Sequence, residues 1–282
     1  MISYPLLAGG TMTRVIEAGR GTDGLIFVHG VSAYAHRWSQ NLEGFAAAGY
    51  RACAFDLPGH GFAAKNDGFP YSVPGYAAFI GAFLDAMSFG TPALVGTSLG
   101  AHIAALFACH NPDRVRALIL VGALGLVPVG ETVRRAIAAA VLDTSRAGLR
   151  AKLQRAHADP TVVTDEWVEE EFHINNSAGA EQTFEQLGAY IAQSLDDDCV
   201  GASLPPLTRR IPTLLVWGEH DRSVGLAVAR AAHAALPGTR LVVIRNAGHA
   251  PYFERPDVFN TVVTTFLAGG FDAVPPHEVI ER

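Results

Sequence analysis

Cysteine is scarce in this sequence: its 282 residues include three, Cys53, Cys109 and Cys199, which lie far apart along the chain. Three scattered cysteines provide neither the disulfide framework of a small secreted domain nor a cluster of thiolate metal ligands. We therefore expect a reduced, cytoplasmic protein that needs no metal ion and no other cofactor.

Positive charge is also in short supply, with 21 lysines and arginines against 27 aspartates and glutamates and a formal net charge of -6 at pH 7. The basic residues form no block, which argues against binding to nucleic acid or to an anionic membrane surface. No apolar run is long enough to span a bilayer. A secretory signal has basic residues before its apolar run, and the short apolar run near the N-terminus has none, so it is not expected to be such a signal. The expected partner is a small-molecule substrate, with a homodimer as a possible assembly.

Hydrophobic residues are abundant, at 49% of the chain, and in a chain of this length they allow one large core. Short apolar runs alternate with longer helical stretches, the pattern of parallel strands joined by helical crossovers. Strands are expected at residues 25–28, 51–55, 93–95, 117–121, 213–217 and 240–244, with a further strand at 11–17. Helices are expected at residues 38–48, 73–87, 99–110, 226–236 and 256–267.

This alternation stops after Val121 and resumes near Ile211. The interval contains only stretches with helical spacing and charged faces, at residues 131–142, 145–156, 164–174 and 182–195. The sequence therefore predicts an α/β domain with an inserted helical cap. The predicted core covers residues 1–124 and 206–270, the cap 125–205 and a loose tail 271–282.

The motif Gly96-Thr97-Ser98-Leu99-Gly100 joins an apolar strand to a helix. Its glycines permit a sharp turn that lifts the Ser98 hydroxyl above the sheet at a helix N-terminus, where backbone N–H groups favour developing negative charge. A G-x-S-x-G sequence arises by chance in many proteins. Its position between a strand and a helix makes Ser98 a candidate nucleophile.

A serine hydroxyl is a poor nucleophile at neutral pH, so this hypothesis requires an acid and a histidine later in the chain. Asp221 and His249 each follow an apolar strand, and their loops lie at the carboxyl edge of the predicted sheet, where Ser98 also emerges. We interpret His249 as the base. Asp221 is preferred to its neighbours Glu219 and His220 as the acid that orients it.

The negative charge that develops on a carbonyl oxygen under attack needs two N–H donors. The residue after the nucleophile, Leu99, is expected to provide one, and Val31, in the loop after the strand at 25–28, the other. Five further residues are expected to contact substrate: Ser32, His36, Trp38, Trp167 and Tyr252. The basic residues in the first half of the cap are interpreted as a solvated helix face rather than as a site for a carboxylate: Arg134, Arg135, Arg146, Arg150, Lys152 and Arg155.

At these positions the chain resembles the α/β-hydrolase superfamily. Five motifs match its landmarks in order: Phe27-Val28-His29-Gly30, Asp56-Leu57-Pro58-Gly59-His60-Gly61, Gly96-Thr97-Ser98-Leu99-Gly100, Trp217-Gly218-Glu219-His220-Asp221 and Gly248-His249. The resemblance implies a mostly parallel central sheet with helices on both faces, an inserted helical cap and a Ser-His-Asp triad.

The resemblance also bears on the chemistry. Haloalkane dehalogenases and epoxide hydrolases carry Asp where this chain has Ser98, so attack on a carbonyl is expected. The cap is most similar to that of meta-cleavage-product hydrolases, which break a carbon–carbon bond next to a ketone in aromatic degradation. That group usually has a Trp after the catalytic His, where this chain has Ala250, and a cap arginine near positions 171–173, where this chain has none.

The expected function is therefore hydrolysis of a small carboxylic ester or lactone through an acyl-enzyme. Carbon–carbon hydrolysis of the meta-cleavage type is the alternative. A non-catalytic small-molecule receptor is a third interpretation, because some members of this fold serve as receptors or signalling partners and keep the triad.

Overall fold

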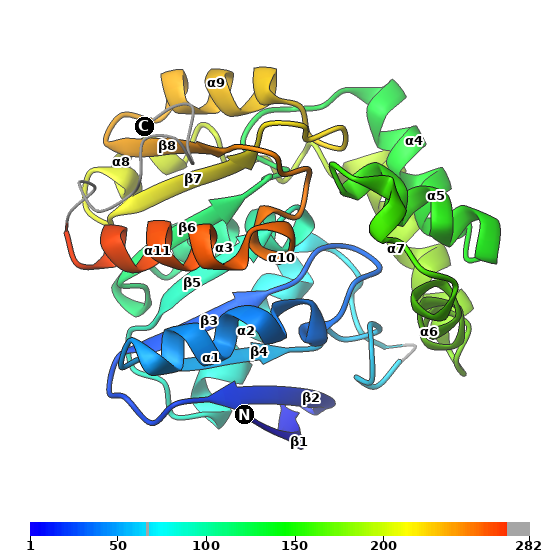
Figure 1. Cartoon of the computed structure of the whole chain (residues 1–282), viewed down its shortest axis with the longest axis horizontal. Coiled ribbons are helices and arrows are strands. Elements are labelled where there is room, and N and C mark those ends of the chain that lie inside the picture. Colours follow the sequence, from blue (N-terminus) through cyan, green and yellow to red (C-terminus); the bar gives the residue numbers. More distant parts are fainter. Residues whose placement is uncertain (66–67, 270–282) are drawn as a thin grey trace.

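The central sheet contains strands β1 (Ile2–Ala8), β2 (Thr11–Ala18), β3 (Gly24–Val28), β4 (Arg51–Phe55), β5 (Ala93–Thr97), β6 (Ala117–Val121), β7 (Thr213–Gly218) and β8 (Thr239–Ile244). The structure, a computed structural model, describes residues 1–65 and 68–269. Within them the eight strands lie in the order β1-β2-β4-β3-β5-β6-β7-β8 (Figure 1). The pairings β1–β2 and β2–β4 are antiparallel, and the others are parallel.

Helices cover both faces of this sheet, so the central strands have no solvated side. Every residue of β3, β5 and β6 is buried, which explains their continuous apolar runs. In β3, Leu25 and Phe27 face the core formed with α1 (Ser39–Ala47) and α11 (Pro256–Leu267). Ile26 and Val28 face the opposite core, formed with α2 (Val73–Ala86), α3 (Leu99–His110) and α9 (Leu226–Ala235).

Of the α-helices between β6 and β7 in the chain, the first four stand beyond one end of the sheet (Figure 1). They are α4 (Glu131–Leu142), α5 (Arg146–Ala156), α6 (Asp165–Asn175) and α7 (Ala180–Ser194). The α4 helix packs on α7, and α5 packs on α6. Side-chain caps set two of their starts, because Ser145 Oγ accepts the Gly148 N–H of α5 and Thr164 Oγ1 accepts the Trp167 N–H of α6. No helix in the described part of the chain has both the length and the hydropathy to cross a bilayer.

The fold is the expected α/β-hydrolase fold, with differences at its margins. The edge strand β1 was not predicted, because it contains Pro5 and leaves Ile2 and Leu7 exposed, so its sequence shows no buried run. The predicted boundary between residues 205 and 206 falls inside a short helix, α8 (Leu204–Thr208). A second short helix, α10 (Pro251–Glu254), follows the His249 loop. The predicted tail at 271–282 lies outside the described residues.

Candidate active site

Ser98 lies at a sharp turn between β5 and α3, with φ 55° and ψ -119°. This positive φ is strained for any residue with a side chain. The flanking glycines permit it: a Cβ at Gly96 would lie 2.3 Å from the Gly100 carbonyl oxygen, and a Cβ at Gly100 would lie 2.4 Å from that of His29. The Ser98 N–H donates to the Val121 carbonyl at 2.9 Å. The backbone thus fixes this residue at the carboxyl edge of the sheet.

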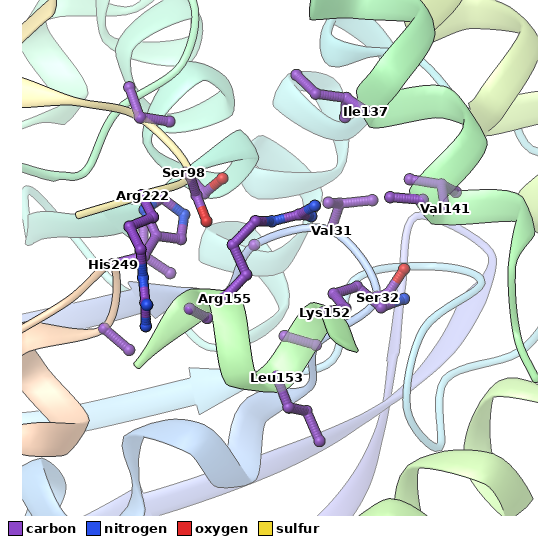
Figure 2. A pocket seen from close by; sticks show the side chains of 18 of the residues that line it. Val31, Ser32, Ser98, Ile137, Val141, Lys152, Leu153, Arg155, Arg222 and His249 are labelled. Atoms are coloured by element: carbon purple, nitrogen blue, oxygen red, sulfur yellow. The ribbon is translucent and has the colours of Figure 1, made fainter. Parts of the chain in front are cut away.

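A buried carboxylate orients the His249 ring. Asp221 Oδ2 lies 2.8 Å from His249 Nδ1, and Asp221 Oδ1 accepts the N–H groups of Ser223 and Val224, each at 2.8 Å. Because an ionised carboxylate can only accept, Nδ1 carries the ring proton and Nε2 is left as the basic nitrogen. Ser98 and His249 line the same cavity (Figure 2).

The loop after β6 leaves room for the side chains of His249 and Asp221. Gly122 has φ 50°, and a Cβ there would lie 2.8 Å from His249 Nδ1 and 3.1 Å from Asp221 Oδ2. The other carboxylate of the acid's loop, Glu219, accepts the Asn246 N–H at 3.1 Å instead of a bond from His249. The structure therefore pairs His249 with Asp221 rather than with Glu219.

The two expected oxyanion donors lie on either side of Ser98. Leu99 begins α3 directly after it. The loop after β3 lies against Ser98, since a Cβ on Gly30 would be 3.2 Å from the Ser98 Cβ, and Val31 lines the cavity. No described acceptor receives a backbone bond from Val31 or Leu99. Both N–H groups are thus available to a ligand.

His29, which begins this loop, is a structural residue. Its Nδ1 donates to the Gly30 carbonyl at 2.7 Å, and its Nε2 accepts the Leu57 N–H at 2.9 Å. Burial lowers the pKa of the ring to about 4, so His29 is neutral at physiological pH. Its two bonds join the loop after β3 to the loop after β4.

A cavity of about 350 Å³ opens above Ser98, between the sheet edge and the helices α4 and α5. One wall is apolar and includes Leu124, Val133, Ile137, Val141, Leu149 and Leu153. Four cationic residues also line the cavity, Arg37, Lys152, Arg155 and Arg222, and Glu171 is the carboxylate among its lining residues. In the described part of the chain, no three His, Cys, Asp or Glu side chains are grouped to hold a metal ion.

Two of these cations are already engaged. Arg37 forms an ion pair with the buried carboxylate of Glu171, and its guanidinium lies 4.2 Å from the centre of the Trp167 ring. Arg222 donates to the backbone carbonyls of Gln154 and His157. The Lys152 ammonium, by contrast, is buried without a hydrogen-bond partner among the described residues.

The structure places the five residues expected to contact substrate in different surroundings. Ser32 and Tyr252 line the cavity, but His36, Trp38 and Trp167 do not. His36 is exposed and bonds to Ser39 at 3.1 Å. Trp38 is fully buried in the core with α11, where it stacks on Tyr252 at 3.8 Å.

Trp167, the third of these residues, packs behind Arg37 against Phe253. Its contact with a substrate would therefore be indirect, through the guanidinium of Arg37. These three side chains lie outside the cavity lining because one is at the surface, one is in the core and one packs within the cap.

The interpretation of the basic cap residues as a solvated face holds for some of them. Arg146 and Arg150 form ion pairs with Glu169 and Asp165 at the surface, and Arg134 lies 3.5 Å from Asp196. Lys152 and Arg155 instead line the cavity. A signal for Lys152 was present in the sequence, because it falls between Leu149 and Leu153 on the apolar side of the helix.

Glu254 ties the end of α5 to the His249 loop. Its two carboxylate oxygens accept the N–H groups of Gly248 and Ala158, each at 2.7 Å. The His249 N–H donates to the Ala156 carbonyl, also at 2.7 Å. The cap and the loop that carries the candidate base therefore form one hydrogen-bonded unit.

Glu254→Ala is expected to lower kcat by about 10- to 100-fold with a small change in KM, because small displacements of a base are costly. Glu254→Gln keeps one acceptor oxygen and is expected to retain more activity. The measurements are kcat, KM and the pH profile of kcat, with thermal unfolding as the control. A lower melting temperature with unchanged kcat and pH profile would reduce Glu254 to a purely structural residue.

Comparison with known proteins gives a consistent family. The family model described as alpha/beta hydrolase fold matches residues 24–256. The dihydrolipoyllysine-residue acetyltransferase component of the acetoin cleaving system of Pseudomonas putida is 30% identical over 265 residues, which are 92% of this chain and 67% of that protein. The 2-hydroxy-6-oxononadienedioate/2-hydroxy-6-oxononatrienedioate hydrolase of Burkholderia vietnamiensis is 28% identical over 272 residues, 92% of each chain.

A solved structure of a meta-cleavage product hydrolase from Pseudomonas fluorescens superimposes with a TM-score of 0.82. The superposition covers 94% of this chain and 97% of that one, at 23% sequence identity. At this identity the similarity establishes the fold alone.

Proposed function

Because the chain belongs to the alpha/beta hydrolase family, we propose that it is a serine hydrolase with Ser98 as its nucleophile. The observation that carries this proposal is the 2.8 Å bond between His249 Nδ1 and Asp221 Oδ2, beside a serine held at the turn after β5. The bond leaves His249 Nε2 free to take the Ser98 proton.

The reaction then follows from the positions of the groups. Ser98 Oγ adds to the substrate carbonyl as its proton passes to His249 Nε2, and Asp221 stabilises the resulting imidazolium. The Val31 and Leu99 N–H groups bind the oxyanion. His249 returns the proton to the leaving group, and a water molecule activated by the same nitrogen hydrolyses the acyl-enzyme.

For the bond that is broken, we propose a carbon–carbon bond next to a ketone in an acid substrate. The sequence favours an ester, since it lacks a cap arginine near positions 171–173. The cavity favours an acid substrate instead, because Lys152 and Arg155 of α5 line it and can take the place of the missing arginine. A relative named as a hydrolase of 2-hydroxy-6-oxo dioic acids supports the same choice.

This cleavage places a further demand on the substrate. When the carbon–carbon bond breaks, its electron pair goes to the departing carbon, which must be stabilised and then protonated. A 2-hydroxy-6-oxo-2,4-dienoic acid meets that demand after a proton adds to C5 and the 2-hydroxyl becomes a 2-oxo group. The electron pair left on C5 then delocalises through the C3–C4 double bond to the 2-oxo oxygen, and the resulting dienolate is protonated on release. The carboxylate of such an acid suits a cationic cavity.

Ester hydrolysis remains the second candidate, and Ala250 is the observation that favours it. The residue lines the cavity directly after His249, where related carbon–carbon hydrolases usually carry Trp. The small side chain leaves room beside the base for an alkoxy or aryloxy leaving group.

The test compares a ring-fission keto acid with p-nitrophenyl esters and lactones on the purified protein. The expected result is a kcat/KM of about 10⁴ M⁻¹s⁻¹ or more for the acid, within the usual enzymatic range, and at least tenfold lower values for esters. Rapid hydrolysis of esters without hydrolysis of the keto acid would reject carbon–carbon cleavage in favour of ester hydrolysis.

A further inference from the structure

The side chain of Lys152 ends inside the cavity without a partner. Its Nζ is buried and makes no hydrogen bond to any described residue. Figure 2 shows Lys152 and Arg155 extending from α5 among the residues that line the cavity with Ser98. The two positions are three apart, so they lie on the same face of the helix. Burying an ammonium whose N–H donors have no acceptor costs free energy unless a ligand binds it.

The charged groups around Lys152 do not neutralise it. The carboxylate with the largest influence, Glu171, is in an ion pair with Arg37 and accepts a bond from Asn175 at 2.9 Å. Asp143 is solvent-exposed and accepts bonds from the Ser145 N–H and hydroxyl. Arg155 and Arg37 add positive charge. Because Glu171 and Asp143 are engaged elsewhere and two arginines add positive charge, the surroundings of Lys152 favour an anionic ligand.

We propose that Lys152 determines specificity by binding a carboxylate of the substrate from helix α5, in place of an arginine near positions 171–173. The proposal rests on the proposed function for the reaction at Ser98. A charge-assisted hydrogen bond from the ammonium satisfies the open donor and compensates its burial. The apolar wall of α4 and α5 then contacts the carbon chain between the carboxylate and the reacting carbonyl.

The ammonium form gives the site a pH dependence. Burial lowers the pKa of Lys152 to about 8, while Glu171 and Asp143 oppose this shift and Arg155 and Arg37 add to it. The cation is present below this pH and is lost as the pH rises through it. KM for acid substrates should therefore begin to rise above about pH 8, and should level off only above the higher pKa that Lys152 has in the complex, because a bound carboxylate favours the charged form.

The first test uses Lys152→Met, which keeps the apolar stem and removes the charge. For a keto acid, kcat/KM is expected to fall about 10- to 100-fold, the range of a lost hydrogen bond to a charged group. The ratio of kcat/KM for the keto acid to kcat/KM for a neutral p-nitrophenyl ester is expected to fall, and Lys152→Arg is expected to recover part of that ratio. Arg146→Met is the matched control on the same helix, because Arg146 pairs with Glu169 at the surface.

A second test does not depend on turnover. Calorimetry on the Ser98→Ala protein should detect binding of pentanoate and much weaker binding of the neutral isostere pentanamide. The double variant with Lys152→Met should lose this preference, with unfolding temperature as the check on folding and Lys152→Gln as the replacement if Met destabilises the protein. Equal affinity for pentanoate with and without Lys152 would overturn the proposal, even if the keto acid is hydrolysed. Retained discrimination by Lys152, without keto acid hydrolysis, would reject only the carbon–carbon reaction.

Discussion

Ser98→Ala and His249→Ala are each expected to reduce kcat by roughly 10⁴-fold or more on any substrate that the protein turns over. The effects should be similar in size and should not add in the double variant, because without either residue the same attack by Ser98 Oγ is lost. Steady-state kinetics on the purified variants measures this. Residual activity above the uncatalysed rate would reflect substrate binding and the N–H groups of Val31 and Leu99.

Ser39→Ala and His36→Ala are suitable controls, since they remove the same chemical groups outside the cavity. Both should retain near wild-type kinetics, and all four variants should unfold at similar temperatures. Activity of Ser98→Ala close to that of the wild type would show that the nucleophile has been misassigned.

Asp221→Asn is expected to lower kcat by about 10⁴-fold while the fold is retained. The amide oxygen can still accept the N–H groups of Ser223 and Val224, which places the amide nitrogen against His249 Nδ1. A donor at that position forces the ring proton onto Nε2. His249 then has no lone pair facing Ser98 and cannot act as the base.

Glu219→Gln is the matched control for this substitution, because Glu219 lies in the same loop and bonds to the Asn246 N–H instead of to His249. Its kinetics should change little. A large loss in Glu219→Gln together with a mild effect in Asp221→Asn would reverse the assignment of the acid.

The features predicted from the sequence are those that depend on short segments. The buried strands appear as continuous apolar runs, and the strand-to-helix turn at Ser98 is marked by Gly96 and Gly100, which no other residue type can replace without overlap. Asp221 and His249 follow from the rule that parallel strands end at one edge of the sheet. Each of these inferences needs only local pattern and topology.

The features that were missed depend on contacts between distant segments. Nothing in the sequence near Trp38 shows that its ring faces the core with α11 rather than the cavity. The pairing of Arg37 with Glu171 joins the loop after β3 to helix α6. By residue type alone, the sequence does not distinguish Lys152 from its basic neighbours, because only the packing of α5 shows which side chains of that helix point inward.

The bonds between α5 and the His249 loop also bear on how the cavity admits a molecule. The Ala156 carbonyl accepts the His249 N–H and the Ala158 N–H donates to Glu254, so the end of α5 cannot lift from the sheet without breaking these bonds to the His249 loop. Under the proposed role of His249 as the base, opening on this side is expected to displace the base and so to stop attack by water as well as attack by Ser98. The exposed Val133 on the α4 side of the cavity makes that side the expected route for a molecule that enters while the His249 loop stays in place.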